Sequence, residues 1–292
     1  MHFPKPVISR RALLATLGTA LTGASLSPIA QAKPAALSVD AIVARNINAR
    51  GGAAAWHSVK ALSMSGLLDA GRTSSADRKL IEESRATPGR PRKRLHPEVT
   101  AAETKAETAI RLPYLIEFRR PRQMRVELKV REVTAVQVYD GQAGWKLRPY
   151  LGRSEVEAYS PHELRLSASQ QELDGPLLDY AAKGTRIKLA GIEAVDGKDA
   201  YRLALTLKTG DEMDVWVDAQ TFLDVRISTR HAGGSHERTI LTTMRDFRKI
   251  GAIMLPFELE DRVAGSGIVQ RIDIQQVSVN PVLADARFSK PV

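Results

Sequence analysis

The sequence predicts a mainly β protein of the α+β class, in which a curved antiparallel sheet forms a half-barrel with a short helical lid on its concave face. Apolar and charged residues alternate with a period of two through most of the chain after Leu62, as in strands with one buried and one wet face. Turn residues separate these runs. Helical patterns are confined to a few segments, which is little cover for about ten strands, and a sheet of that size tends to curl.

The chain is expected to enter the sheet through a helix. Ser38 is a suitable N-cap, and Gly51–Gly52 should end the helix. A short second helical turn is expected around Trp56. The apolar stripe of the first helix is formed by Ile42, Val43 and Ile47.

The predicted strands place their apolar side chains on one common face. Opposite positions in the same runs are mostly charged or polar. The turn signals between the runs are Asp140-Gly141, Asp196-Gly197, Thr209-Gly210-Asp211 and Gly233-Gly234. The apolar positions include Tyr114, Ile116, Phe118, Met124, Val126, Leu128, Val130, Tyr201, Leu203, Leu205, Leu207, Met213, Val215, Val217, Leu223, Val225, Ile227, Ile268, Ile272 and Ile274.

Two segments interrupt the alternation. Residues 160–184 read as one or two helices, since Ser160-Pro161 suits a helix start and Gly184 suits a helix end; this is the predicted lid. Residues 84–107 are polar, basic and rich in proline, and we interpret them as a flexible loop between strands. The loop either docks on anionic lipid headgroups or is a solvated spacer.

Residues 1–32 have the pattern of a cleaved signal peptide. Lys5, Arg10 and Arg11 precede a short apolar run, and Ala30-Gln31-Ala32 is a cleavage signal. Ser9-Arg10-Arg11 fits the twin-arginine export motif of bacteria, with an ordinary Sec signal as the alternative. Residues 33–292 would then form a single mature domain, exported to the periplasm.

Composition limits the kinds of partner and of membrane attachment that we expect for the protein. Removing the three signal charges from the net +10 leaves +7 for the mature chain, which suits anionic surfaces or acidic partners. Nucleic acid is not expected as a partner, because aromatic residues are only 5% and do not alternate with the arginines. With no cysteine, the protein has no disulfide and no lipid anchor on an N-terminal cysteine. No later apolar run is long enough to span a bilayer, so we expect a soluble monomer.

No catalytic or metal motif stands out. His231 and His236 with Glu237 flank a glycine turn, where solvated histidines are commoner than a metal site. The stretch 191–199 fails the spacing of a phosphate-binding loop. Asp214 and Asp218 share a wet strand face, which leaves paired-carboxylate chemistry open but unsupported. We therefore expect no cofactor, no metal and no catalysis.

The motifs EFRRPRQMRVEL and VYDGQAGWKLRP resemble the LolA/LolB-like superfamily of outer-membrane lipoprotein carriers. Further likenesses are NARGGAAAWHSVKALSMSG, the stretch from residue 189 to 226, DFRKIGAIMLPFELE and VNPVLADARFSKP, so the resemblance covers nearly all of the mature chain. It implies an open half-barrel with an apolar concave face that holds acyl chains. It also implies that Arg120, the arginine before Pro121, holds the lid closed; Arg119 is expected on the opposite strand face.

The resemblance leads to a carrier or binder of acylated molecules as the predicted function. The expected partners are the acyl chains of a lipoprotein or phospholipid, together with a membrane-bound protein that donates or accepts the cargo. A lipid- or stress-sensing interaction module is the alternative, and an envelope hydrolase is the third reading. The predicted cavity lining is Phe118, Met124, Val126, Leu128, Trp145, Tyr201, Leu203, Met213, Val215 and Ile227, unless these residues form a plain core under the helices.

Overall fold

The computed structural model describes residues 37–69, 111–170, 173–231, 238–264 and 269–291. Within these residues the chain forms one sheet of thirteen antiparallel strands with a few short helices, which confirms the predicted fold class. The predicted signal peptide, the basic loop 84–107 and the Gly233-Gly234 turn lie outside the described residues. None of the helices in the described part is long and apolar enough to cross a membrane.

The elements follow one another as short helices at the start, strands, a central helix, and strands again. The helices are α1 (Val39–Ala49), α2 (Ala53–Ser58), the 3₁₀ helix η1 (Pro149–Leu151), α4 (Pro161–Gln170) and the 3₁₀ helix η2 (Asp285–Phe288). The strands are β1 (Ala61–Asp69), β2 (Arg111–Arg119), β3 (Gln123–Val130), β4 (Val133–Tyr139), β5 (Gly144–Arg148), β6 (Arg153–Ala158), β7 (Arg186–Val195), β8 (Lys198–Thr206), β9 (Glu212–Asp218), β10 (Asp224–His231), β11 (Arg238–Ile250), β12 (Ile253–Val263) and β13 (Val269–Val279).

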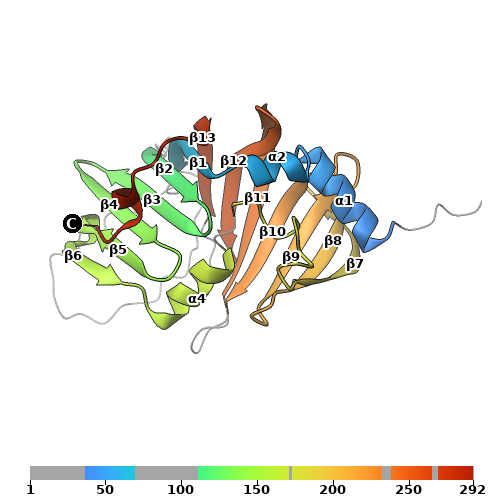
Figure 1. Ribbon diagram of the computed structural model, residues 1–292, viewed down its shortest axis with the longest axis horizontal. Helices are drawn as coiled ribbons and strands as arrows, with labels where there is room; N and C mark the ends of the chain where they lie inside the picture. Colours follow the sequence, from blue (N-terminus) through green and yellow to red (C-terminus); the bar gives the residue numbers. More distant parts are fainter. Residues whose placement is uncertain (1–36, 70–110, 171–172, 232–237, 265–268, 292) are drawn as a thin grey trace, which may run out of the picture. The chain divides into compact units, whose positions relative to one another are not determined.

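The sheet consists of two meanders that meet at its centre. Its order is β6-β5-β4-β3-β2-β1-β13-β12-β11-β10-β9-β8-β7, so neighbouring strands are consecutive in the chain except where β1 pairs with β13. Figure 1 shows β2–β6 on one side of this central pair and β7–β12 on the other. The strands β6 and β7 are the two free edges of the described sheet.

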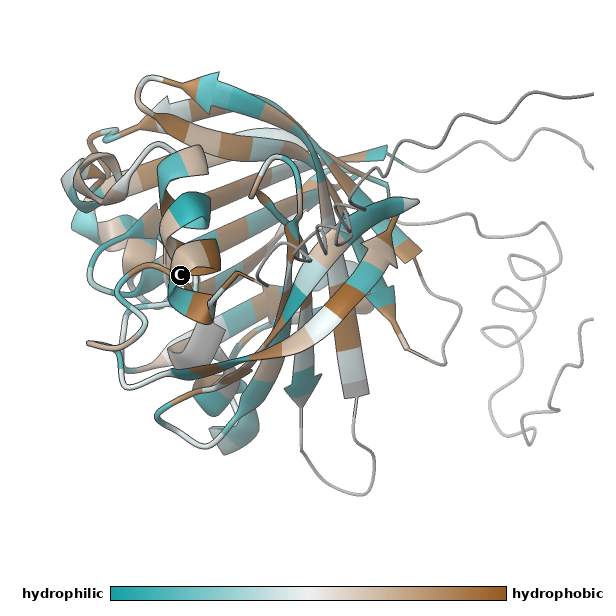
Figure 2. Cartoon of the chain, turned by 90° about the vertical axis from the view of Figure 1, so that its right-hand side faces the viewer, coloured by the Kyte–Doolittle hydropathy of each residue, from teal (hydrophilic) through white to brown (hydrophobic). Residues whose placement is uncertain are grey.

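The two faces of the sheet differ in chemistry, as the alternation predicted. The inner face is the one that contacts α1, α2 and the lid segment (residues 160–184), and it is largely apolar. On β2 and β3, for example, Ile116 pairs with Val126 on the inner face, whereas Glu117 pairs with Arg125 on the outer face. Figure 2 shows apolar and polar bands alternating along the strands.

The first helices form where the sequence predicted them. Ser38 caps α1 by accepting a hydrogen bond from the backbone N–H of Ala41. Gly51 and Gly52 have positive φ angles and turn the chain between α1 and α2. At Gly51 a Cβ would lie 2.1 Å from the backbone oxygen of Ala252, so only glycine fits.

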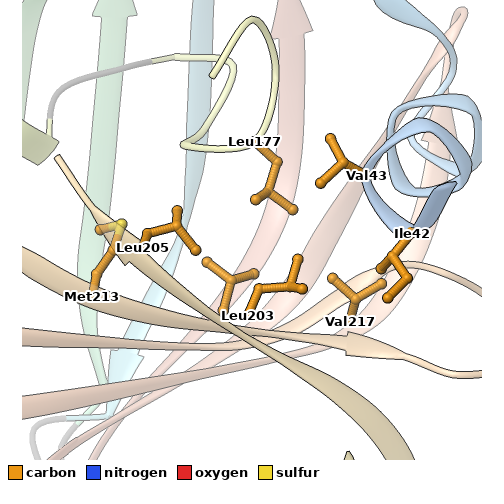
Figure 3. Packing of buried hydrophobic residues seen from close by; sticks show 8 residues of the cluster. Ile42, Val43, Leu177, Leu203, Leu205, Met213 and Val217 are labelled. Atoms are coloured by element: carbon orange, nitrogen blue, oxygen red, sulfur yellow. The ribbon is translucent and has the colours of Figure 1, made fainter. Parts of the chain in front are cut away.

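Two apolar clusters fix the helices and the lid segment on the inner face. In the first, Ile42 and Val43 of α1 and Leu177 of the lid segment point toward the strands β8 and β9 (Figure 3). In the second, Trp56 of α2 and Leu178 of the lid segment pack on Leu62, Ile253 and Leu255. Adjacent leucines of the lid segment therefore bind different clusters, so the segment joins them.

The lid segment contains one helix, within the one or two predicted, followed by turns. It begins with α4, where Ser160 and Glu163 exchange the two hydrogen bonds of a capping box. Residues 173–184 are turns instead of a second helix. Pro176 lacks a backbone N–H and disfavours helical geometry at the residue before it, Gly175, which has a φ of +77°.

Candidate binding site

A hollow of about 650 Å³ lies over the inner face of the sheet, a volume typical of small-molecule sites. Strands from both meanders form its wall, and Trp56 of α2 and the lid segment form its cover. Its apolar lining is Trp56, Leu62, Met64, Ile116, Phe118, Met124, Ala168, Leu173, Pro176, Leu207, Met213, Ile227, Met244, Phe247, Met254, Leu255, Pro256, Leu259 and Ile272.

Six of the ten predicted lining residues lie at or beside this hollow. Phe118, Met124, Met213 and Ile227 line it directly. Val126 and Leu128 share the inner face, because they pair with Ile116 and Tyr114, which line the hollow.

Three predicted lining residues belong to the filled core instead. Leu203 and Val215 are 0% exposed and lie under α1 and Leu177. Tyr201 borders the same cluster and stacks on Phe222, with ring centroids 6.1 Å apart. These residues are on the expected face, but α1 occupies the space above them.

Trp145 is on the opposite face from the one predicted. It pairs with Val138 on the outer face and packs there with Val136, Val138 and Phe288. The partner that buries it is the C-terminal segment around η2, which crosses the outer face. Arg119 also contacts this segment: its guanidinium lies 4.6 Å from the centroid of the Phe288 ring and donates to Asp285 Oδ1 at 2.7 Å.

Arg120 connects the β2 end to both covering elements. Its Nε donates to the backbone oxygen of Val59 at 2.8 Å, and its Nη2 donates to the backbone oxygen of Trp56 at 3.1 Å. The same Nη2 donates to Asp174 Oδ2 at 2.8 Å, in the lid segment. Arg120 therefore bridges α2 and the lid segment, at the position where the resemblance placed the lid contact.

Asp174 is the anion at the centre of this network. Its side chain is only 5% exposed, and Lys183 Nζ donates to its Oδ1 at 2.9 Å. Burial would raise the pKa of Asp174, but the hydrogen bonds and charges of Lys183 and Arg120 outweigh burial and lower it. Arg50 Nη1 adds a hydrogen bond to the Asp174 backbone oxygen at 2.9 Å. The lid segment is thus held by charged hydrogen bonds as well as by apolar packing.

The hollow also contains ionisable residues that were not singled out. Asp261 and Tyr114 line it together with Thr242 and Thr229. The period-two pattern Leu255, Phe257, Leu259, Asp261 already places this aspartate on the inner face.

The carboxylates considered for catalysis have structural roles. Asp214 is buried on the outer face and accepts hydrogen bonds from Arg202 and Arg230. Asp218 accepts the backbone N–H groups of Gln220 and Thr221 in the turn after β9. Within the described ranges no group of three or more metal-ligating side chains converges, and His236 and Glu237 lie outside those ranges.

The sheet, the hollow and the short cover define an open β half-barrel built around an apolar site. No protein-family model matches the sequence, and no curated protein matches it either. Solved structures do. A LolA superfamily protein from Nitrosomonas europaea is 14% identical with a TM-score of 0.53, and the match covers 87% of this chain and 99% of that one.

Two further structures share the fold at similar distance. A DUF1329 family protein from Desulfovibrio piger is 15% identical with a TM-score of 0.50, covering 86% of this chain and 97% of that one. A putative outer membrane lipoprotein-sorting protein domain from Vibrio parahaemolyticus is 11% identical with a TM-score of 0.50, covering 85% and 95%. At these identities the likeness shows the fold, which is LolA-like.

Proposed function

We propose that the protein binds the acyl chains of a lipoprotein or phospholipid in the hollow and carries or presents them without catalysing a reaction. The observation that carries this proposal is the hollow itself, whose wall is the apolar inner face of the sheet and whose cover is short. An apolar hollow favours an aliphatic guest over water, because water finds few hydrogen-bond partners there. The Vibrio parahaemolyticus domain of the same fold is described as a putative outer membrane lipoprotein-sorting protein, which agrees with such a guest.

The free energy gained by burying such a guest suits reversible binding. Burying each CH₂ group contributes about 0.8 kcal/mol, so one long acyl chain offers on the order of 10 kcal/mol before the costs of association. A carrier has to return this energy on delivery. A cover held by the Asp174 network, which can separate without breaking the sheet, provides a route for release.

The cellular setting is part of the same proposal. Export through the predicted signal peptide would place the mature chain in the periplasm as a soluble protein, between donor and acceptor membranes. The LolA-like fold of the solved neighbours agrees with this setting. The twin-arginine route stays a prediction from residues 9–11.

Native mass spectrometry of protein purified from the periplasm tests the proposal. We expect a mass excess from bound lipid and saturable binding of a fluorescent acyl probe. Ile116→Asp places a charge in the wall of the hollow and should reduce both by about tenfold or more. Ser278→Asp is the matched control, since Ser278 is exposed and lies opposite Ser63 on the outer face. Protein at bare polypeptide mass that also fails to bind the probe would refute the proposal.

A second function is favoured by one observation on the outer face. A groove of about 420 Å³ lies between Trp145 and the C-terminal segment, with Arg119, Asp140 and Phe288 among its lining residues. Such a groove suits a lipid-sensing module that binds a partner protein there. The two functions are separable, because Gln142→Arg at this groove should block a partner and leave acyl-probe binding unchanged.

A further inference from the structure

Asp261 is a carboxylate in the wall of the hollow, whose lining also includes the cations Arg50, Arg122, Lys183 and Lys208. It lies on the inner face of β12, two residues beyond Leu259, and both line the hollow. Thr242 lies directly opposite on β11 and donates its hydroxyl hydrogen to Asp261 Oδ1 at 2.6 Å. An ionised carboxylate has room for about four hydrogen bonds, and among the described residues Thr242 is the side chain that donates one to it.

No cation compensates this carboxylate within the described part of the chain. No lysine or arginine nitrogen of those residues lies within 4.0 Å of its oxygens, although the adjacent Glu260 has three arginine partners on the outer face. Burial raises the pKa of Asp261, and the hydrogen bond from Thr242 only partly offsets this. An uncompensated carboxylate in such a place costs stability, so packing gives no reason for it.

Tyr114 is a second polar residue of the hollow, on β2. Burial, followed by the negative charge of Asp261, raises the pKa of the Tyr114 hydroxyl. Gly66 pairs with Tyr114 and adds no side chain beside it. A Cβ at Gly66 would lie 1.9 Å from the backbone oxygen of Asp273, so the bulge between β1 and β13 requires glycine.

We propose that Asp261, Thr242 and Tyr114 form a polar binding site inside the hollow for the protonated amino group of an amphiphilic guest. This inference rests on the proposed function, because the apolar part of the guest would occupy the hollow. A guest ammonium group supplies the donors and the positive charge that the described residues do not place against Asp261, and hydrogen bonds between two charged groups are the stronger kind. The Tyr114 hydroxyl, which stays protonated, can accept one donor of the same group. A guest carboxylate would instead be repelled by Asp261.

Competition by three amphiphiles of equal chain length tests the site. Dodecylamine, dodecanol and dodecanoate, each below its aggregation concentration, would displace a fluorescent acyl probe from the full mature protein. For the wild-type chain we expect dodecylamine to compete about tenfold or more better than dodecanol, with dodecanoate weakest. Asp261→Asn should reduce the ratio of amine to alcohol affinity to about one, and Thr242→Val should reduce it partly.

Glu258→Gln is the matched control. Glu258 lies on the same strand and pairs with Arg245 on the outer face, and its loss changes the net charge by the same amount. We expect the ratio to stay at the wild-type value in this variant. An equal ratio in the wild-type and Asp261→Asn proteins would overturn the inference while leaving the proposed function standing. Failure of dodecanol itself to displace the probe, or of the probe to bind, would overturn both.

Discussion

Two parts of the inner face have the same sequence pattern and different surroundings. On β8 and β9, Leu203 faces Val215, and both are fully buried under α1. On β1 and β2, Met64 faces Ile116, and both border the hollow. The two pairs of strands are alike in alternation and pairing. The hollow therefore results from the incomplete cover above Met64 and Ile116.

The lengths of the elements explain why the cover is incomplete. The 11 residues of α1 make a helix of about 16 Å, which spans three or four strands spaced about 4.8 Å apart. Thirteen strands extend over about 60 Å around the curve. The lid segment covers part of the remainder with turns anchored by Leu177 and Leu178. Part of the inner face, on β1–β3 and β9–β13, is left as the wall of the hollow.

The largest expected effect is a difference in how much stability the protein loses when a side chain is truncated in each of these two parts. Leu203→Ala should destabilise the fold by about 3 kcal/mol, because it leaves a cavity in a closed core. Ile116→Ala should cost about 1 kcal/mol or less, because its side chain already borders empty space. Urea unfolding monitored by tryptophan fluorescence would measure both. Equal losses would mean that the hollow is packed in solution and the contrast between the two parts is false.

The next effect concerns the cover over the open part. Arg120→Leu removes the bridge from β2 to Asp174 and Trp56 and should increase the dissociation rate of an acyl probe by about tenfold, which corresponds to the loss of one charged hydrogen bond. Stopped-flow displacement would measure it. Arg119→Leu is the matched control, since Arg119 contacts the C-terminal segment on the outer face. Unchanged dissociation in Arg120→Leu would remove this residue from the release step.

The smallest expected effect is a gain in stability instead of a loss, and it depends on pH. The folded-state pKa of Asp261 is raised, so its ionisation costs stability at pH above both the folded and the unfolded pKa, and costs nothing below the unfolded value of about 3.9. Asp261→Asn should therefore stabilise the protein by up to about 1 kcal/mol at pH 7 and change nothing near pH 3. Chemical unfolding at the two pH values measures this. A destabilised Asp261→Asn protein at pH 7 would mean that the carboxylate supports the fold.

Its neighbour Glu260 gives the contrasting pH profile. Burial would raise the pKa of Glu260, but Arg262 and Arg271 lower it through hydrogen bonds. Its contribution to stability is therefore present above the unfolded pKa and is lost as the pH falls through the folded pKa. Two adjacent carboxylates on opposite faces thus respond to acid in opposite directions.

Much of the fold could be predicted from alternation, but the extent of the cover could not. Alternation assigned Leu203 and Ile116 to the same face correctly. Alternation could not indicate that α1, which lies more than 150 positions before Leu203 in the chain, covers Leu203 and does not cover Ile116. The wrong face for Trp145 arose because five residues of β5 carry little periodic signal, and its partner Phe288 comes from the far C-terminal segment. The position of Asp261 on the inner face was predictable, because the alternation of β12 extends to this residue.

The central pairing of β1 with β13 determines the stage of synthesis at which the hollow can form. Leu62 lies opposite Val279, whereas all other neighbouring strands of the described sheet are consecutive in the chain. Each meander can form from local hairpins, but the central pair must close a loop nearly as long as the described chain, which makes it entropically costly and slow to form. During synthesis β13 emerges after every other strand. Because the wall of the hollow includes Met64 of β1 and Ile272 of β13, the hollow is complete only after translation of the sheet has finished.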